Sequence, residues 1–313
     1  MPVLFTVLLI SNIVQAENMD PDGTDARYGW GENIGWLNAE PSGNGGPGVE
    51  VADSKLTGYI WSENIGWISL SCENIGSCGT VDYGVLNDGS GTLSGYAWSE
   101  NAGWISFSCS NTSTCQTVDY KVAVDPGTGV FSGYAWGENI GWVSFDYTTS
   151  QSSIAKTSWL QDSDGDGLSD VFEEGTGSCT FSDDADTDDD GIPDGVEDTN
   201  QNGIIDTGET DPCLADTDND GIQDGTEIGL TLTDIGTDTD TGVFIPDADP
   251  GTTTLALDAD TDDDGLTDGE EDTNFNGRLD SGESDPNNAL SPEDFPWELF
   301  YPAFIKKNTQ INQ

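Results

Sequence analysis

The sequence lacks histidine and has few basic residues. No histidine occurs among the 313 residues, which removes the usual general base, the Ser-His-Asp triad and histidine-based zinc sites. Seven Lys and Arg residues stand against 60 Asp and Glu residues, so the formal net charge is -53 at pH 7. A charge of this sign repels nucleic acid and anionic membranes. These absences predict a protein that is not an enzyme and has no nucleic-acid partner.

Long apolar runs are missing from most of the chain. Beyond the N-terminus, no run approaches the roughly 18 residues of a membrane-spanning helix, so we expect no membrane span. The stretch Val3–Ile10 is mostly apolar and is followed by Ala16 and the acidic Glu17. This pattern predicts a signal peptide over residues 1–16, although it lacks the usual basic start. The alternatives are a first buried strand or a start codon placed too late. The predicted location is extracellular, either secreted or on the outer cell surface.

The six cysteines form an even set without CxxC spacing, so disulfides in an oxidising compartment fit better than zinc. Two pairs share the same spacing at equivalent places in neighbouring repeats. Equivalent placement favours a local bridge in each repeat, with bridges between repeats as the alternative. The favoured pairs are Cys72–Cys78 and Cys109–Cys115.

Residues 26–148 contain a tandem tryptophan repeat. The motif Tyr-x-Trp-Ser/Gly-Glu-Asn-Ile/Ala-Gly-Trp occurs at 28–36, 59–67, 96–104 and 134–142. Successive second tryptophans are 31, 37 and 38 residues apart, which indicates a repeat architecture. Polar and apolar residues alternate between the motifs, and Gly, Asn and Asp mark the turns. The pattern predicts about three short antiparallel strands in each repeat.

The two tryptophans of each motif are predicted to face each other across a hairpin. We expect them to form the core of the repeat, because so small a unit has few other residues to bury. The alternative is a carbohydrate-binding module with exposed indoles, or an accessory domain of a secreted hydrolase system. Glu63, Glu100 and Glu138 recur with the turn and give no distinguished catalytic pair. The motif resembles tryptophan-rich tandem segments of bacterial surface proteins, a likeness that implies no chemistry.

The second half carries most of the acid: 43 of the 60 carboxylates lie in residues 161–313. The pattern DxDxDGxxDxxE, with Asn variants, occurs there six times. Carboxylates at places one, three, five, nine and twelve, with glycine at place six, are the side chains of an oxygen cage for calcium. Asparagine at places three and five of the third and sixth loops lowers their charge and predicts weaker binding.

The six loops predict about six Ca²⁺ sites, with all metal ligands drawn from the pattern. The predicted ligands are Asp162, Asp164, Asp166, Asp170 and Glu173 in loop one (162–173); Asp186, Asp188, Asp190, Asp194 and Glu197 in loop two (186–197); Asp198, Asn200, Asn202, Asp206 and Glu209 in loop three (198–209); Asp216, Asp218, Asp220, Asp224 and Glu227 in loop four (216–227); Asp260, Asp262, Asp264, Asp268 and Glu271 in loop five (260–271); and Asp272, Asn274, Asn276, Asp280 and Glu283 in loop six (272–283).

Back-to-back spacing separates these loops from EF-hands. Loop three follows loop two at once, and loop six follows loop five, so no residues remain for flanking helices. Residues 162–286 resemble thrombospondin type 3 repeats in the form found in bacterial surface proteins. The resemblance implies a chain wrapped around a row of calcium ions. It departs from the animal version in its glutamate at place twelve and its few cysteines. Cys179 and Cys213 flank loops two and three and are predicted to pair.

Three further segments complete the prediction. The interval 228–259 contains degenerate acidic stretches at 238–242 and 247–249 and is expected to be a spacer with one irregular site, or to form a short hairpin over 242–245. Without metal, so acidic a segment is predicted to be disordered, and calcium is expected to fold it. The aromatic tail, 287–313, is predicted to dock as a strand or to act as a secretion or attachment signal.

The predicted fold is mainly β. Tandem antiparallel β repeats with disulfide-stapled loops (26–148) are followed by a linker (149–161) and an irregular calcium-wrapped array (162–286) with little regular secondary structure. The predicted function is that of a calcium-binding extracellular or cell-surface structural or adhesive protein, in which calcium stiffens an acidic stalk. The expected partners are calcium ions and a cell-surface or matrix protein or glycan.

Overall fold

The computed structural model describes residues 18–41, 48–145 and 155–290, so the predicted signal peptide and most of the predicted tail lie outside it. The chain forms two compact units, Met1–Gln161 and Asp162–Gln313, and the second starts at the first residue of loop one. The predicted linker, 149–161, falls within the first unit, and its residues 155–161 are described. There Trp159 is buried, and its Nε1 donates to Asp53 Oδ1 at 2.7 Å.

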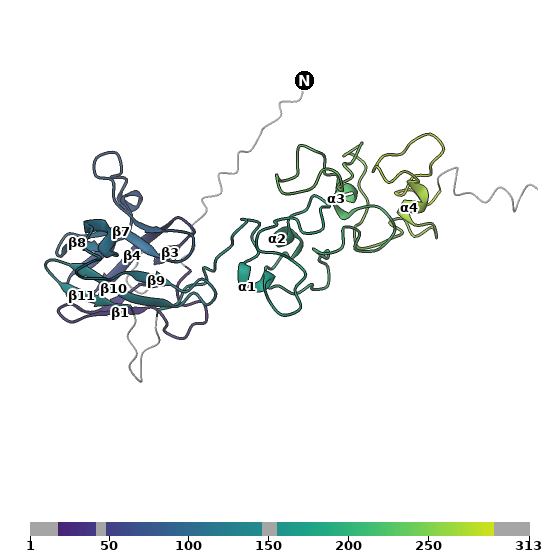
Figure 1. The fold of residues 1–313 in the computed structure, drawn as a ribbon. Coiled ribbons are helices and arrows are strands. Elements are labelled where there is room, and N and C mark those ends of the chain that lie inside the picture. The colour runs from purple at the N-terminus through teal and green to yellow at the C-terminus, as the bar shows by residue number, and fades with distance from the viewer. Residues whose placement is uncertain (1–17, 42–47, 146–154, 291–313) are drawn as a thin grey trace, which may run out of the picture. The chain divides into compact units, whose positions relative to one another are not determined.

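The first unit is an antiparallel β structure (Figure 1), as the sequence predicts. Each repeat contributes a hairpin whose strands are joined by the Glu-Asn-containing turn. The strands are β1 (Tyr28–Gly31), β2 (Gly35–Asn38), β3 (Val49–Val51), β4 (Lys55–Ser62), β5 (Gly66–Ser69), β6 (Val85–Asn87), β7 (Leu93–Ser99), β8 (Gly103–Ser106), β9 (Val122–Val124), β10 (Phe131–Gly137) and β11 (Gly141–Ser144).

The four hairpins close into a barrel. Pairing runs β1–β2–β4–β5–β7–β8–β10–β11, and β11 also pairs with β1, so this path has no free edge. The remaining strands lie off the path: β3 pairs with β4, β6 pairs with β4 and β7, and β9 pairs with β10. Closure satisfies the edge hydrogen bonds that tandem hairpins would otherwise expose. The sequence pattern predicts the hairpins but not their closure.

The paired tryptophans face each other but do not form the core. In all four hairpins the two indoles are direct cross-strand partners, with ring centroids 4.6 to 5.0 Å apart. Burial alternates along β4, so Ile60 is buried while Tyr59 and Trp61 are half-buried on the outer face. The core is filled instead by aliphatic residues such as Ile68 and Ile105, together with Phe107 and Phe145. The prediction of a tryptophan core is wrong, because strand alternation turns the residues beside each motif tryptophan inward and leaves the indole on the outer face.

The hairpin turns are tied in a ring by asparagine. Each turn asparagine donates through Nδ2 to a backbone carbonyl in the neighbouring turn, and the first reaches the fourth. The bonds are Asn64 to Ile34 O, Asn101 to Ile65 O and Asn139 to Ala102 O, each 3.0 Å, and Asn33 to Ile140 O, 3.1 Å. The accepting residues are buried and cover one end of the barrel. The repeated asparagine therefore serves barrel closure.

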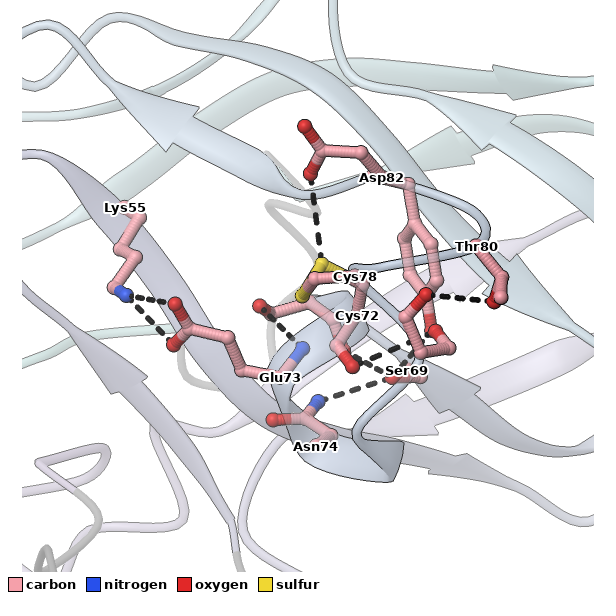
Figure 2. Close-up of a disulfide and its surroundings, with 11 residues drawn as sticks. Lys55, Ser69, Cys72, Glu73, Asn74, Cys78, Thr80 and Asp82 are labelled. Atoms are coloured by element: carbon pink, nitrogen blue, oxygen red, sulfur yellow. Dashed lines mark hydrogen bonds and ion pairs between the residues drawn. A yellow bond between two sulfur atoms is a disulfide. The ribbon is translucent and has the colours of Figure 1, made fainter.

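Two disulfides staple equivalent loops, as predicted: Cys72–Cys78 and Cys109–Cys115. Each loop starts with a short 3-10 helix, η2 (Cys72–Ile75) or η3 (Cys109–Thr112). In Figure 2, Asn74 of η2 lies beside Ser69 of β5, to which its Nδ2 donates at 3.0 Å. Asn74 also accepts from Gly58 N at 3.1 Å and donates to Gly58 O, which anchors the loop on β4.

The second unit has little regular secondary structure, as predicted. Its helices are single turns: α1 (Asp170–Glu173), α2 (Asp194–Glu197), α3 (Asp224–Glu227) and α4 (Asp268–Glu271). The predicted disulfide between Cys179 and Cys213 is present. Among the described residues, none of the helices has the length and hydrophobicity that a membrane-spanning segment requires.

The interval 228–259 packs against acidic loops two and four. No strand forms over 242–245, so the hairpin alternative is wrong. Instead Phe244 is buried, and its ring would lie 2.9 Å from a Cβ added at Gly191 of loop two. Thr254 Oγ1 donates to Glu227 Oε1 of loop four at 2.9 Å. The interval is therefore an integral part of the second unit rather than a spacer.

Candidate metal centre

All six loops adopt the same turn. In each, the carboxylate at place one accepts the N–H of the glycine at place six, at 2.6 to 3.1 Å. The residue at place four has a left-handed backbone in every loop, with φ between 54° and 83°. This turn gathers the odd-numbered side chains. In loop one, oxygens of Asp162, Asp164 and Asp166 lie within 4.8 Å of one another.

Loops one, two and four bury carboxylate oxygens that no donor satisfies. Glu173 and Glu197, at place twelve of loops one and two, are each 2% exposed, and neither oxygen of either has a hydrogen-bond partner. At place three, Asp164, Asp188 and Asp218 each use Oδ1 to accept a backbone N–H, while Oδ2 is buried and unpaired. Buried oxygens of this kind are costly unless a cation coordinates them.

The carboxyl groups buried in these loops have raised pKa values. Burial raises the pKa of Glu173 to about 8, that of Glu227 to about 9 and that of Glu197 to about 10, and repulsion from neighbouring aspartates adds to each shift. Burial likewise raises the pKa of Asp188 to about 7 and that of Asp190 to about 8. Metal-free, the site favours protonated carboxyl groups.

The fifth-place aspartates join the loops in series. Asp166 accepts the N–H of Gly195 at 2.7 Å, which links loop one to loop two. Equivalent hydrogen bonds join the later loops. The N–H of Gly225 in loop four donates to Asp190 of loop two (3.0 Å), and the N–H of Gly269 in loop five donates to Asp220 of loop four (2.8 Å). A Cβ on Gly225 would lie 2.0 Å from Asp190 O, so the contact requires glycine at place ten.

Sequence reasoning missed this link, although a signal was present. Glycine occupies place ten in loops two, four and five, whereas loop one has Val171 there. Loop one has no preceding loop to contact, so a side chain is tolerated. Loops three and six have Thr207 and Ser281 at this place, so glycine there marks the loops that dock on another loop.

The ninth-place carboxylates have two roles that the sequence does not separate. Asp194 of loop two accepts the backbone N–H and the hydroxyl of Thr187 at 2.8 and 2.6 Å. Yet one of its oxygens also lies within 4.8 Å of Asp166 and Glu173 of loop one. The candidate site of loop one thus includes a carboxylate that sequence analysis assigned to loop two. In loops one, two, four and five, the backbone N–H at place two donates to the ninth-place carboxylate and so positions it. The donors are Ser163, Thr187, Thr217 and Thr261.

In loops three and six, asparagine side-chain amides donate hydrogen bonds to the carboxylates of the same loop. In loop three, Asn200 Nδ2 donates to Glu209 Oε1 at 2.9 Å, and Asn202 Nδ2 donates to Asp206 at 2.9 Å. The amide hydrogen bonds lower the pKa of Asp206, which is exposed. Loop six repeats the arrangement through Asn274 and Asn276. Amide donors thus already satisfy carboxylate oxygens of these two loops, and weaker calcium binding by them stays a prediction.

Residues 238–242 of the interval 228–259 form hydrogen bonds with loop two and with the residue that precedes it. Asp238 Oδ2 accepts from Ala185 N at 3.2 Å, and Asp240 N donates to Asp189 Oδ1 at 2.6 Å. Further along, Asp247 is 5% exposed, and its Oδ2 is buried without a partner. Burial raises the pKa of Asp247. Asp247 is therefore a further candidate oxygen ligand beside loop six.

The interior of the second unit is acidic rather than apolar. Among its described residues, five apolar side chains are buried: Leu168, Ile192, Ile222, Phe244 and Ala256. Twelve carboxylates are buried: Glu173, Asp186, Asp190, Asp194, Glu197, Asp198, Asp224, Glu227, Asp247, Asp268, Glu271 and Asp272. The one ion pair found in the described part of this unit joins Arg278 to Asp280. Basic side chains therefore do not neutralise the interior.

Comparison with known proteins gives no relative for this chain. No protein family, curated protein or solved structure matches it.

Proposed function

We propose that residues 162–286 form a calcium-binding structural module. The observation that carries the proposal is the set of buried, unpaired carboxylate oxygens at places three and twelve, exemplified by Asp188 and Glu197. A bidentate glutamate opposite aspartates of a tight loop is the donor set of a Ca²⁺ cage. Calcium would supply the positive charge that this interior lacks.

The donor chemistry favours calcium over other metals. The candidate ligands are oxygens, the chain has no histidine, and its cysteines are paired in disulfides. Softer metals such as Zn²⁺ prefer nitrogen and sulfur. Mg²⁺ demands regular octahedral geometry and retains water, which suits a crowded carboxylate cage poorly.

Calcium binding would be coupled to folding, because five buried apolar side chains cannot offset the chain entropy of a unit this long. The three disulfides are typical of proteins that mature in an oxidising compartment. We therefore place the protein outside the cell or on its surface, an environment rich in calcium. Dissociation constants of roughly 10⁻⁴ to 10⁻³ M are usual for extracellular calcium-binding modules. The role of the protein there is structural or adhesive, with the acidic unit as a calcium-stiffened stalk.

The test is calcium titration of the full chain after treatment with a chelator. We expect isothermal titration calorimetry to detect several Ca²⁺ per chain, and circular dichroism to show calcium-dependent ordering and a higher melting temperature. Magnesium at the same concentration serves as the control and should give a smaller change. Absence of calcium uptake, or identical spectra and melting temperatures with calcium and with chelator, would disprove the proposal.

A further inference from the structure

The outward-facing tryptophans border a groove on the barrel. It has a volume of about 1050 Å³ and runs across the surfaces of repeats three and four. Its aromatic lining is Tyr83, Tyr96, Trp98, Trp104, Tyr120, Trp136 and Trp142. Trp104 and Trp142 are 43% and 37% exposed, so their rings are accessible to a ligand.

The disulfide loops build the aromatic walls. Tyr83 follows the first disulfide loop, and its ring lies 5.4 Å from that of Trp104 in the next repeat. Tyr120 follows the second, and its ring lies 5.1 Å from that of Trp142. The hydroxyl of Tyr83 donates to Ser69 Oγ at 3.0 Å, and Tyr120 bonds Ser106 in the same way at 3.1 Å. These rings are therefore held in place before any ligand arrives, which lowers the entropic cost of binding.

A second groove repeats the design. It has a volume of about 590 Å³ and lies between repeats four and one, where Trp30, Tyr134 and Trp142 line it. Each groove also contains an exposed glutamate from a hairpin turn. The first groove has Glu138 of repeat four, and the second has Glu32 of repeat one. The same combination of indole, phenol and carboxylate thus recurs at adjacent repeat junctions.

The polar lining selects the class of ligand. Neither groove contains a Lys or Arg, and both contain carboxylates, so anionic ligands are repelled. The first groove adds the hydroxyls of Thr112, Thr114 and Thr117 and the amide of Asn139. Aromatic faces suit the apolar C–H faces of sugar rings, while carboxylate, amide and hydroxyl groups suit their hydroxyls.

We propose that these grooves bind a neutral oligosaccharide, with pyranose rings stacked on Trp104 and Trp142 and hydroxyls donating to Glu138. The size of the first groove supports an extended ligand, since about 300–1000 Å³ is typical of small-molecule sites and a single ammonium group would fill little of it. A cationic peptide is the competing occupant, because aromatic rings and carboxylates also attract cations. All residues that line the two grooves belong to the first unit.

The test uses the full chain with calcium present and three neutral probes: cellotetraose, mannotetraose and tetra-N-acetylchitotetraose. Tetragalacturonate and tetralysine are the anionic and cationic comparisons. We expect at least one neutral probe to bind by calorimetry and to change tryptophan fluorescence, with little dependence on salt. Trp142→Ala should weaken binding about tenfold or more, since it removes a stacking ring. Glu138→Gln should weaken it less, because a carbonyl oxygen still accepts.

The matched control is Trp67→Ala, which removes the equivalent ring of repeat two from outside both grooves. It should change affinity less than about twofold, and circular dichroism should confirm that both tryptophan variants are folded. The proposal is overturned if no neutral probe binds, if tetralysine alone binds, or if Trp67→Ala weakens binding as much as Trp142→Ala.

Discussion

Glutamate at the twelfth place of a loop has two different environments in this protein. In loop two, Glu197 is buried with both oxygens unpaired, whereas in loop three Glu209 is half-buried and accepts from Asn200. The residue type and its place in the pattern are the same. The neighbouring amides, present in one loop and absent in the other, decide how strongly a cation is needed.

This difference predicts unequal effects of the same substitution. Glu197→Gln should remove one calcium from the measured stoichiometry, or weaken that site about tenfold or more, because it takes a full charge from a buried cage. Glu209→Gln, its matched control, should change total calcium binding much less. Calorimetric titration of both variants checks the prediction, which equal losses would contradict.

Neighbouring residues of one hairpin turn also differ in role. Asn101 donates to Ile65 O at 3.0 Å and so links two hairpins, while Glu100 beside it is exposed. Asn101→Ala leaves that buried carbonyl without its donor. The expected loss in unfolding free energy of the first unit is about 0.5–1.5 kcal/mol.

Glu100→Ala is the control and should cost less than about 0.5 kcal/mol, as is usual for surface substitutions. Urea unfolding followed by tryptophan fluorescence reports on the first unit, because nine of the ten tryptophans lie in it. A larger loss for Glu100→Ala than for Asn101→Ala would show that the asparagine ring does not stabilise the barrel.

At the scale of elements, the short helices α2, α3 and α4 are docking points between loops. The second residue of each is glycine, and its N–H donates to the fifth-place aspartate of the preceding loop in the series. A helix of one turn has little stability alone. These helices are therefore held by the loop on which they dock.

Gly225→Ala tests the docking contact. The added methyl would lie 2.0 Å from Asp190 O, so the loops must separate. We expect the calcium-loaded second unit to lose about 1–3 kcal/mol of stability, the usual cost of overpacking. Val171→Ala changes the same place in loop one, which docks on no preceding loop, and should cost less. Thermal unfolding by circular dichroism in calcium compares the two; a smaller loss for Gly225→Ala would contradict the contact.

At the scale of the whole molecule, the two units are stabilised by different forces. The first has an apolar core of aliphatic and phenylalanine side chains in a closed barrel, and no metal is needed to bury it. The second buries more carboxylates than apolar side chains. Removing calcium should therefore affect the second unit and spare the first.

The stability of the second unit should depend on pH when the unit is metal-free and much less when calcium is bound. Burial raises the pKa of Glu173, Glu227 and Glu197 from 4.5 to about 8, 9 and 10, so the metal-free fold keeps protons that the unfolded chain releases. Its stability should therefore fall as pH rises from about 4.5 toward about 10. Calcium requires the deprotonated ligands, so its stabilising effect should grow over the same range.

Melting temperatures near pH 5 and near pH 8, with chelator and with calcium, check this prediction by circular dichroism. Calcium uptake near neutral pH should also release protons, which calorimetry in two buffers of different ionisation enthalpy measures. A metal-free unit that becomes more stable at the higher pH would contradict the expected sign.

The sequence by itself determined the local structure. Turn residues and alternation predicted the hairpins, equal spacing predicted the two local disulfides, and a repeated template predicted the positions of six acidic loops. Each of these depends on residues close together in the chain. Local geometry is therefore readable from spacing and periodicity.

Only the tertiary structure decided which face of each strand is buried and which loops are in contact. Closure of β11 onto β1 put Ile60 inside and Trp61 outside, and docking brought Asp194 of loop two to the ligands of loop one. Alternation alone gives two faces but does not say which one is buried, and a twelve-residue template does not say what lies beside it. Both depend on contacts between residues far apart in sequence, which no local pattern encodes.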